Sequence, residues 1–196
     1  MRLLIATTNP GKIREYQQLL NGLNCDLIGL VDVGITQDVD ETGSTYEANA
    51  LLKAQEYAAL SGLLTLADDS GLEVDALDGR PGVHSARYAP DSPTRIRKLL
   101  GEMQNVPADQ RTARFQCVIA LAWPDGRTEI TVGTCAGWIS TEARGSNGFG
   151  FDPVFYVPER GVTMAELPDE VKNQISHRAR AAQKMRPILE RILRET

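Results

Sequence analysis

The sequence predicts an α/β fold built on a mixed sheet, and two observations carry this prediction. Near the amino end, the apolar run Leu3–Ala6 is followed by a tight loop and then by apolar residues at helical spacing. Further along, the segments "FQCVIALAW" and "TEITVGTCAGWI" are joined by "PDGR", which is typical of an antiparallel hairpin. A chain that alternates strands with helices and also contains a hairpin is expected to form a mixed sheet.

The first predicted elements are a strand, a loop and a helix. Leu3–Ala6 forms the strand, Asn9 is a good N-cap, and Pro10 suits the first helical position. The apolar residues at helical spacing are Ile13, Tyr16, Leu19 and Leu20. We expect the helix to end at Asn21–Gly22 and a second strand to cover Asp26–Val31.

A longer helix is predicted after an acidic stretch. Ser44 and Glu47 form the S-x-x-E pattern of a capping box. The residues expected on one side of this helix are Tyr46, Ala50, Ala54, Tyr57, Ala58 and Ser61. Gly62 fits a C-terminal cap. The run "LLTLA" is then predicted as a third strand that ends at the acidic pair Asp68 and Asp69.

Loops separate the later elements. "DALDGRPGVHSARYAP" is rich in glycine and proline and is expected to be a loop region, and Pro93–Glu102 is expected to be a helix. The glycine-rich loop "RGSNGFGFDP" follows the hairpin. The last predicted helix has Ser176 as its N-cap. Its apolar stripe consists of Ala182, Met185, Leu189, Ile192 and Leu193.

Composition narrows the classes of partner. The chain has 196 residues, enough for one large domain or two small lobes, and a net charge of −5. This charge argues against a nucleic-acid partner or an acidic membrane surface. Cys25, Cys117 and Cys135 lack C-x-x-C spacing and are interpreted as reduced thiols. The apolar runs are too short for a signal peptide or a membrane span, so we expect a cytoplasmic protein.

The stretch "LADDSGLEV" places two carboxylates where a buried strand is expected to end. Ligands of α/β proteins bind at strand ends, although Asp, Ser and Gly are also common turn formers. Adjacent strand residues point to opposite sides, so Asp68 and Asp69 are expected to have different roles. A carboxylate from this pair and one from the acidic cluster Asp38–Thr42 could together hold Mg²⁺. The alternative for the cluster is a solvated loop, and Glu47 is most simply a capping residue.

Two groups of cations suggest an anionic ligand. In "TTNPGK", a loop, a helix N-terminus and Lys12 together suit a phosphate group, although a plain capped helix start explains the same residues. In the last helix, His177 and Arg178 follow Ser176 at once, and cations at a helix N-terminus oppose the macrodipole. A bound anion or a polar base edge would explain them. The alternative is a salt bridge to Glu170 or to the acidic cluster around residues 38–41.

The segment "SNGFGFD", Ser146–Asp152, allows close backbone approach at its glycines. Phe149 and Phe151 could act as platforms for a base. The alternative is a glycine turn with two core phenylalanines.

In this order, "TTNPGK", "ETGSTYEANALLKA", "ADDSGLEVDALDGRPGVHSARYA", "GFGFDPVF" and "KNQISHRARA" resemble the inosine/xanthosine triphosphate pyrophosphatase family. Members of this family remove non-canonical purine nucleoside triphosphates. The resemblance runs from Leu3 to the final helix, nearly the whole chain. The succession of "DDSGL", "GRPGVHSARYA" and "SHR" is highly specific.

The resemblance implies an elongated mixed central sheet flanked by helices, in one domain spanning residues 1–196, with two lobes and an active-site cleft between them. It implies a homodimer, a Mg²⁺ cofactor and hydrolysis of ITP, dITP and XTP to the monophosphate and pyrophosphate. The implied metal ligands are Glu41 and Asp69, and Asp69 would also activate the water. The implied substrate contacts are Thr7, Thr8, Asn9, Pro10, Gly11, Lys12, Ser70, Phe149, Gly150, Phe151, Asp152, Lys172, His177 and Arg178.

One position departs from the family pattern. The family usually has "T-F-x-E-N-A" before the long helix, and here Ala48 stands at the glutamate position while Glu47 lies one place earlier. Neither residue is therefore assigned a metal role. Two other functions fit the same motifs, a nucleotide-binding sensor without catalysis and a pyrophosphatase for pyrimidine or methylated nucleotides.

Overall fold

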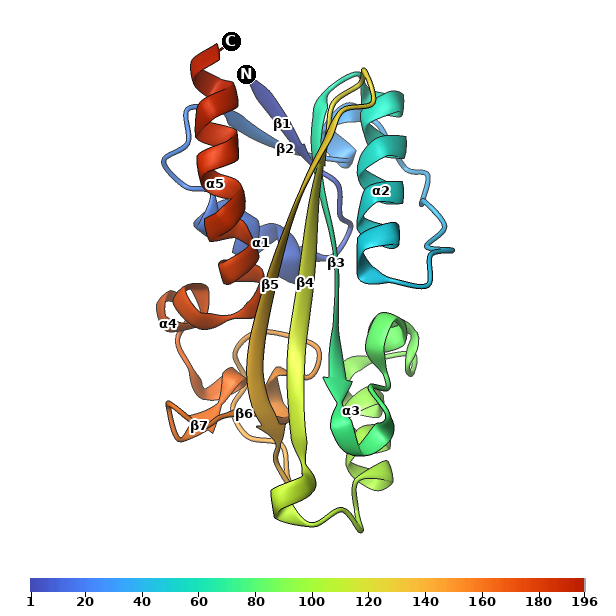
Figure 1. Cartoon of the computed structure of the whole chain (residues 1–196), viewed down its shortest axis with the longest axis vertical. Coiled ribbons are helices and arrows are strands. Elements are labelled where there is room, and N and C mark those ends of the chain that lie inside the picture. The colour runs from blue at the N-terminus through green and yellow to red at the C-terminus, as the bar shows by residue number, and fades with distance from the viewer. Residues whose placement is uncertain (196) are drawn as a thin grey trace. The chain divides into compact units, whose positions relative to one another are not determined.

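The computed structural model describes residues 1–195 and confirms a mixed α/β fold (Figure 1). Its strands are β1 (Arg2–Ile5), β2 (Asp26–Gly29), β3 (Leu64–Val74), β4 (Thr112–Ala122), β5 (Thr128–Ile139), β6 (Phe155–Val157) and β7 (Val162–Thr163). Its helices are α1 (Pro10–Leu19), α2 (Tyr46–Ser61), α3 (Ser92–Glu102), α4 (Asp169–Ile175) and α5 (His177–Glu195). The strand order in the sheet is β2-β1-β3-β4-β5-β6-β7. Strand β1 pairs in parallel with β2 and β3, whereas β6 pairs antiparallel with β5 and β7.

The chain divides into two compact units, each with its own hydrophobic core. Unit 1 comprises Met1–Asp69, Cys117–Gly133 and the chain from Arg178 onward. Unit 2 comprises Ser70–Gln116 and Thr134–His177. Two lobes were expected, and the cleft between them stays a prediction. In the described part of the chain, no helix is both long and apolar enough to cross a membrane.

Helices α1 and α5 pack on one face of the sheet in unit 1, and α2 lies on the other face (Figure 1). Tyr16 and Leu20 from the α1 segment meet Met185 and Leu189 of α5 in the same core. Helix α1 begins as predicted, because the Asn9 side chain accepts hydrogen bonds from the backbone N–H groups of the first turn and Pro10 fills the first position.

The predicted cap of α2 is wrong by one residue. Thr45, not Ser44, is the N-cap, and its hydroxyl oxygen accepts a hydrogen bond from the N–H of Ala48 at 3.1 Å. The Ser44–Glu47 pattern therefore makes no capping box at this terminus, because the helix starts one residue later than that pattern requires. At the other end, Gly62 caps the helix with a φ of +68°, as predicted.

The third strand does not end at the acidic pair. Strand β3 continues through Asp68 and Asp69 to Val74. It lies between β1 and β4 in the sheet, so ladder hydrogen bonds override the turn preference of Ser70 and Gly71. Its parallel neighbour β1 ends earlier, with Ile5 opposite Leu66. The acidic pair consequently lies just beyond the carboxyl end of β1, where the "TTNPGK" loop begins.

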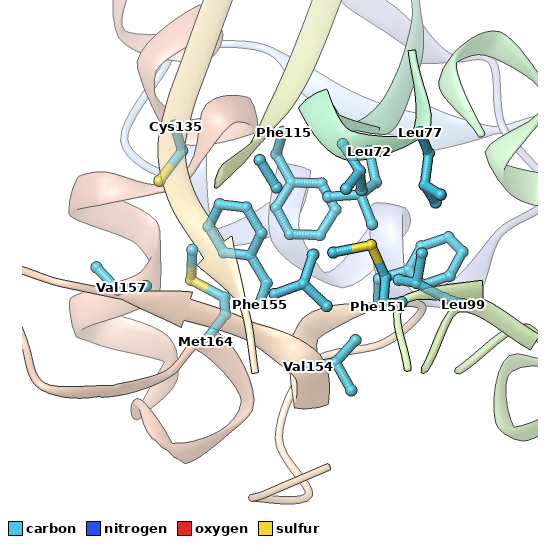
Figure 2. Packing of buried hydrophobic residues seen from close by; sticks show 14 of the residues in the cluster. Leu72, Leu77, Leu99, Phe115, Cys135, Phe151, Val154, Phe155, Val157 and Met164 are labelled. Carbon is cyan, nitrogen blue, oxygen red and sulfur yellow. The ribbon is translucent and has the colours of Figure 1, made fainter. Parts of the chain in front are cut away.

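Unit 2 is built around aromatic and sulfur-containing side chains. Phe115 and Phe155 pack with ring centroids 4.4 Å apart, and Leu72, Met164 and Phe151 belong to the same core (Figure 2). The short elements α4, β6 and β7 lie in this unit and are absent from the sequence prediction. The helix predicted at 93–102 is confirmed as α3.

Candidate active site

The two aspartates of β3 point to different partners, as the alternation of a strand requires. One carboxylate oxygen of Asp68 lies 3.0 Å from Lys12 Nζ and 3.1 Å from Arg178 Nη2. One carboxylate oxygen of Asp69 accepts a hydrogen bond from the side-chain amide of Asn49 at 3.0 Å. The prediction that the two residues have different roles is therefore consistent with separate environments inside unit 1.

Asp68 is a buried anion among cations. Burial opposes its ionisation, but Lys12, Arg178 and Lys53 outweigh burial and hold the pKa of Asp68 well below its ordinary value. The thiol of Cys117 lies 3.6 Å from the same oxygen that contacts Lys12 and Arg178. Because its side chain is only 1 % exposed, Asp68 has little access to a ligand and is suited to holding its neighbours.

Asp69 and Glu41 face a shared cation, the side chain of Lys53. Lys53 Nζ donates to Glu41 Oε1 at 2.5 Å and lies 3.9 Å from Asp69 Oδ1. It also donates to the backbone carbonyl of Asp68 at 2.7 Å. Burial and the charge of Glu41 raise the pKa of Asp69, although the charge of Lys53 lowers it. Because its pKa is raised, the Asp69 carboxylate is a better proton acceptor.

Sequence reasoning missed both Lys53 and Asn49. They stand at i and i+4 on α2, so both side chains reach the same side of the helix. The sequence contains a signal for them, because Asn49 and Lys53 lie next to the apolar side of the helix, among alanines and tyrosines. Polar side chains that are buried at such a position need hydrogen-bond partners.

The residues present fit a divalent cation. In the described chain, residues 1–195, no group of three or more His, Cys, Asp or Glu side chains could hold a metal. Mg²⁺ in nucleotide sites, however, commonly takes one or two carboxylates and completes its shell with phosphates and water. Glu41 and Asp69 supply two carboxylates. They lie 2.5 and 3.9 Å from the Lys53 ammonium, so a positive charge is accommodated beside both carboxylates.

The "TTNPGK" loop is accessible, but its main-chain donors are partly used. The Asn9 side chain accepts hydrogen bonds from the N–H groups of Gly11 and Lys12 at 2.9 and 3.3 Å. The accessible members of the loop are the exposed Thr8, Asn9 and Pro10 and the half-buried Thr7, Gly11 and Lys12. Lys12 contributes the positive charge near this loop, and Asp68 fixes its position.

Arg178 is a buried structural cation as well as a candidate contact for a base. Its guanidinium donates to Glu15 Oε2 at 2.6 Å and to Asp68 Oδ2 at 3.1 Å. These two partners of Arg178 differ from those that the sequence suggested, Glu170 and the acidic cluster at 38–41. Glu15 was not considered in the sequence, because a carboxylate 163 residues away gives no local pattern.

In unit 2, Asp152 organises the glycine loop. Its carboxylate accepts from Lys172 Nζ at 2.5 Å and from the Phe149 N–H at 2.8 Å. Lys172 Nζ also lies 4.9 Å from the centre of the Phe149 ring. Gly148 has a φ of +71°, and a Cβ there would come 2.1 Å from the Asp152 carboxylate, so this loop requires glycine.

The remaining predicted substrate contacts differ in burial. Phe149 and Gly150 are half-buried, and so is Ser70, whereas Phe151 is buried in the core of unit 2. Phe151 is therefore not an open base platform, and its burial matches the alternative of a core phenylalanine. The His177 ring stacks on Phe115 with centroids 4.6 Å apart.

These features define a class, an α/β protein with paired carboxylates and converging cations suited to an anionic ligand and a divalent metal. The chain belongs to the Ham1 family, whose model matches residues 3–188. It is 52% identical over 186 residues to the dITP/XTP pyrophosphatase of Geobacillus kaustophilus, covering 93% of this chain and 91% of that protein. It is 45% identical over 190 residues to the dITP/XTP pyrophosphatase of Bacillus subtilis, covering 95% and 96%.

Solved structures show the same fold. A HAM1 protein from Coxiella burnetii has a TM-score of 0.89 and 40% identity, covering 97% of this chain and 99% of that one. The Ham1 protein of Staphylococcus aureus has a TM-score of 0.87 and 42% identity, covering 98% and 100%.

Proposed function

We propose that this chain hydrolyses non-canonical purine nucleoside triphosphates, namely ITP, dITP and XTP, to the monophosphate and pyrophosphate in the presence of Mg²⁺. The family membership and the names of its relatives support this class of substrate. The observation that carries the chemistry is that the Glu41 and Asp69 carboxylates both face the ammonium of Lys53, in the same unit as Lys12.

Glu41 and Asp69 would hold the metal. When bound, Mg²⁺ neutralises phosphate charge and stabilises the negative charge that develops at the α-phosphorus. Lys12 and Lys53 add positive charge for the phosphates, and the exposed "TTNPGK" loop offers side-chain donors beside them.

Asp69 acts as the general base in this proposal. It accepts a proton from the attacking water while the water oxygen forms a bond to the α-phosphorus. The bond between the α-phosphorus and the oxygen bridging to the β-phosphorus breaks, and pyrophosphate leaves with that oxygen. Asn49 orients the Asp69 carboxylate through its 3.0 Å hydrogen bond.

Recognition of the base would depend on hydrogen-bond donors. Lys172, His177 and Arg178 carry donors that suit the 6-oxo group of hypoxanthine or xanthine. The 6-amino group of adenine would leave such donors without an acceptor, which is costly in a buried site. Asp152 supports this role because it fixes Lys172 and the main chain of Phe149.

A substrate panel tests the proposal. The canonical dNTPs, dITP, XTP and dUTP are incubated with the enzyme, and both pyrophosphate and the monophosphate are quantified. We expect dITP and XTP to be cleaved with Mg²⁺ and no cleavage with EDTA. Binding without hydrolysis would favour the nucleotide sensor, and preferential cleavage of dUTP would favour a pyrimidine pyrophosphatase.

Replacing the base is the sharper test of mechanism. Asp69→Asn keeps the size of the side chain and removes its basic oxygen, so turnover should fall by roughly 10²–10⁴-fold while the fold survives. Asp125→Asn is the matched control, since Asp125 lies exposed in the β4–β5 connection and pairs with Arg127. Steady-state kinetics and circular dichroism measure both, and full turnover in Asp69→Asn would contradict the assignment.

The homodimer and the cytoplasmic location belong to the same proposal. Light scattering of the purified protein should give twice the mass of one chain. A monomeric mass at micromolar concentration would contradict the dimer without affecting the chemistry.

A further inference from the structure

One residue of β3 contacts three cations. The side chain of Asp68 binds Lys12 Nζ at 3.0 Å and Arg178 Nη2 at 3.1 Å through a single oxygen. Its backbone carbonyl accepts from Lys53 Nζ at 2.7 Å. The same carbonyl lies 3.5 Å from Lys12 Nζ.

The three cations, Lys12, Lys53 and Arg178, need a nearby negative charge. Like charges that converge on one region repel each other, and in a partly buried site water screens this repulsion only weakly. Side-chain exposure is 14 % for Lys12, 12 % for Lys53 and 2 % for Arg178. A fixed anion between them offsets the repulsion and determines where each cation points.

The Asp68 carboxylate is enclosed by its protein partners. Its side chain is 1 % exposed, and its second oxygen, Oδ1, is buried without a hydrogen-bond partner in the described chain. The residue therefore acts through its neighbours.

We propose that Asp68 is a positioning residue that aligns Lys12 for the phosphates and Arg178 for the base through one shared carboxylate oxygen. This inference rests on the proposed function for the roles of Lys12 and Arg178, but the placement of the two side chains is independent of it. Glu15 contacts Arg178 through a different nitrogen, Nη1, and so leaves the Nη2 contact to Asp68.

The first experiment measures binding without catalysis. Inorganic tripolyphosphate is titrated in EDTA by calorimetry into the wild type, Asp68→Asn and Cys117→Ser. Asp68→Asn should weaken binding at least fivefold because Lys12 loses its anchor. Cys117→Ser is the matched control, since Cys117 touches the same oxygen as a neutral group, and its affinity should stay within twofold.

The second experiment measures selectivity. In Asp68→Asn, kcat/KM for ITP should fall at least tenfold, and the ratio of kcat/KM for ITP to that for ATP at least threefold. A merely structural role would lower activity on both nucleotides equally. Tripolyphosphate affinity and the ITP-to-ATP ratio within twofold of the wild type in folded Asp68→Asn would overturn the inference.

A second variant covers the case in which Asp68→Asn fails to fold. Lys12→Met together with Asp68→Asn removes one charge of each sign from the Lys12–Asp68 ion pair and is compared with Lys12→Met alone. Adding Asp68→Asn should then change tripolyphosphate affinity less than twofold yet still lower the ITP-to-ATP ratio. A fivefold further loss of affinity would show that Asp68 does not act through Lys12.

The outcomes separate the two claims. If the wild type cleaves none of ITP, dITP and XTP but Asp68→Asn loses tripolyphosphate binding, the proposed function fails and the placement of Lys12 stands. If the wild type cleaves them and Asp68→Asn behaves like the wild type, the inference fails and the function stands.

Discussion

At the scale of single residues, the buried polar groups near the candidate active site have shifted pKa values. The Tyr16 hydroxyl is buried without a hydrogen-bond partner in the part of the chain that the structure describes. Burial, with further contributions from Asp68 and Cys117, raises the pKa of Tyr16 well above its ordinary value near 10. This phenol therefore stays neutral in the folded state at pH values where the unfolded chain ionises.

Tyr16→Phe should reveal this linkage. The folded pKa is raised, so the contribution of Tyr16 to stability is complete below pH 10 and is lost as the pH rises further. The free energy of unfolding of the wild type should fall relative to the variant by about 1.4 kcal/mol per pH unit above pH 10. At pH 7 the variant should already be more stable by about 1–3 kcal/mol, since it lacks a buried hydroxyl that has no hydrogen bond in the described chain.

Urea unfolding at pH 7, 9, 10 and 11 measures the effect. The control is Tyr156→Phe, because Tyr156 lies on β6 and is only half-buried. Parallel pH profiles for the wild type and Tyr16→Phe would show that Tyr16 ionises normally in the folded protein.

A site residue could be predicted from the sequence where its role follows from a pattern of neighbouring residues. The period of a strand was enough to separate Asp68 from Asp69, and the cap motif was enough to place Asn9 and Pro10. The partners of Asp68 were beyond reach, because Arg178 is 110 residues away and the pairing is a product of the tertiary fold. Glu41 and Asp69 came from the family resemblance.

At the scale of elements, α2 links the candidate metal ligands to the sheet. Asn49 and Lys53 lie on one side of this helix, and both contact Asp69. The N-terminus of the helix follows the segment that contains Glu41. Gly43 connects the two parts, because its N–H donates to the Asn49 side chain at 2.8 Å. The start of α2 therefore affects both stability and the orientation of the site.

Thr45→Ala should destabilise this helix start. The variant loses the hydrogen bond from the Ala48 N–H, and loss of an N-cap typically costs about 1 kcal/mol. Ser44→Ala is the matched control, since the exposed Ser44 is not the cap, and it should change the free energy of unfolding by less than about 0.5 kcal/mol. Denaturant unfolding compares the two, and a larger loss in Ser44→Ala would restore the capping box that the sequence suggested.

The elements that sequence reasoning missed are short. Strand β7 has 2 residues, β6 has 3 and α4 has 7, and such segments leave too few positions for a periodic pattern. The continuation of β3 through the acidic pair was missed for a different reason. Pairing on both edges in the middle of the sheet outweighs the local turn preference of Ser70 and Gly71.

At the scale of the whole molecule, the chain order and the division into units do not coincide. Unit 1 takes three separate stretches of sequence and unit 2 takes two. The boundaries at 69/70, 116/117 and 133/134 fall inside β3, β4 and β5, so each of these strands runs through both units, and β3 and β4 contribute side chains to both cores. The resemblance implied two lobes, but the sequence did not predict where the chain divides, because these boundaries fall inside strands.

The shared strands predict that the two cores unfold together. Leu66→Ala removes a buried side chain from the core of unit 1 and Leu99→Ala one from unit 2, and each should lower the free energy of unfolding by about 2–5 kcal/mol. Strands β3 and β4 pack in both cores, so a loss of packing in one half of these strands should weaken the other half. Each variant should therefore shift the whole transition. Leu60→Ala, at a position that is 50% exposed, is the matched control and should shift it little. Calorimetry should therefore show a single peak in every variant. A second peak in either core variant would mean that the units unfold independently, and that the continuous strands do not couple them.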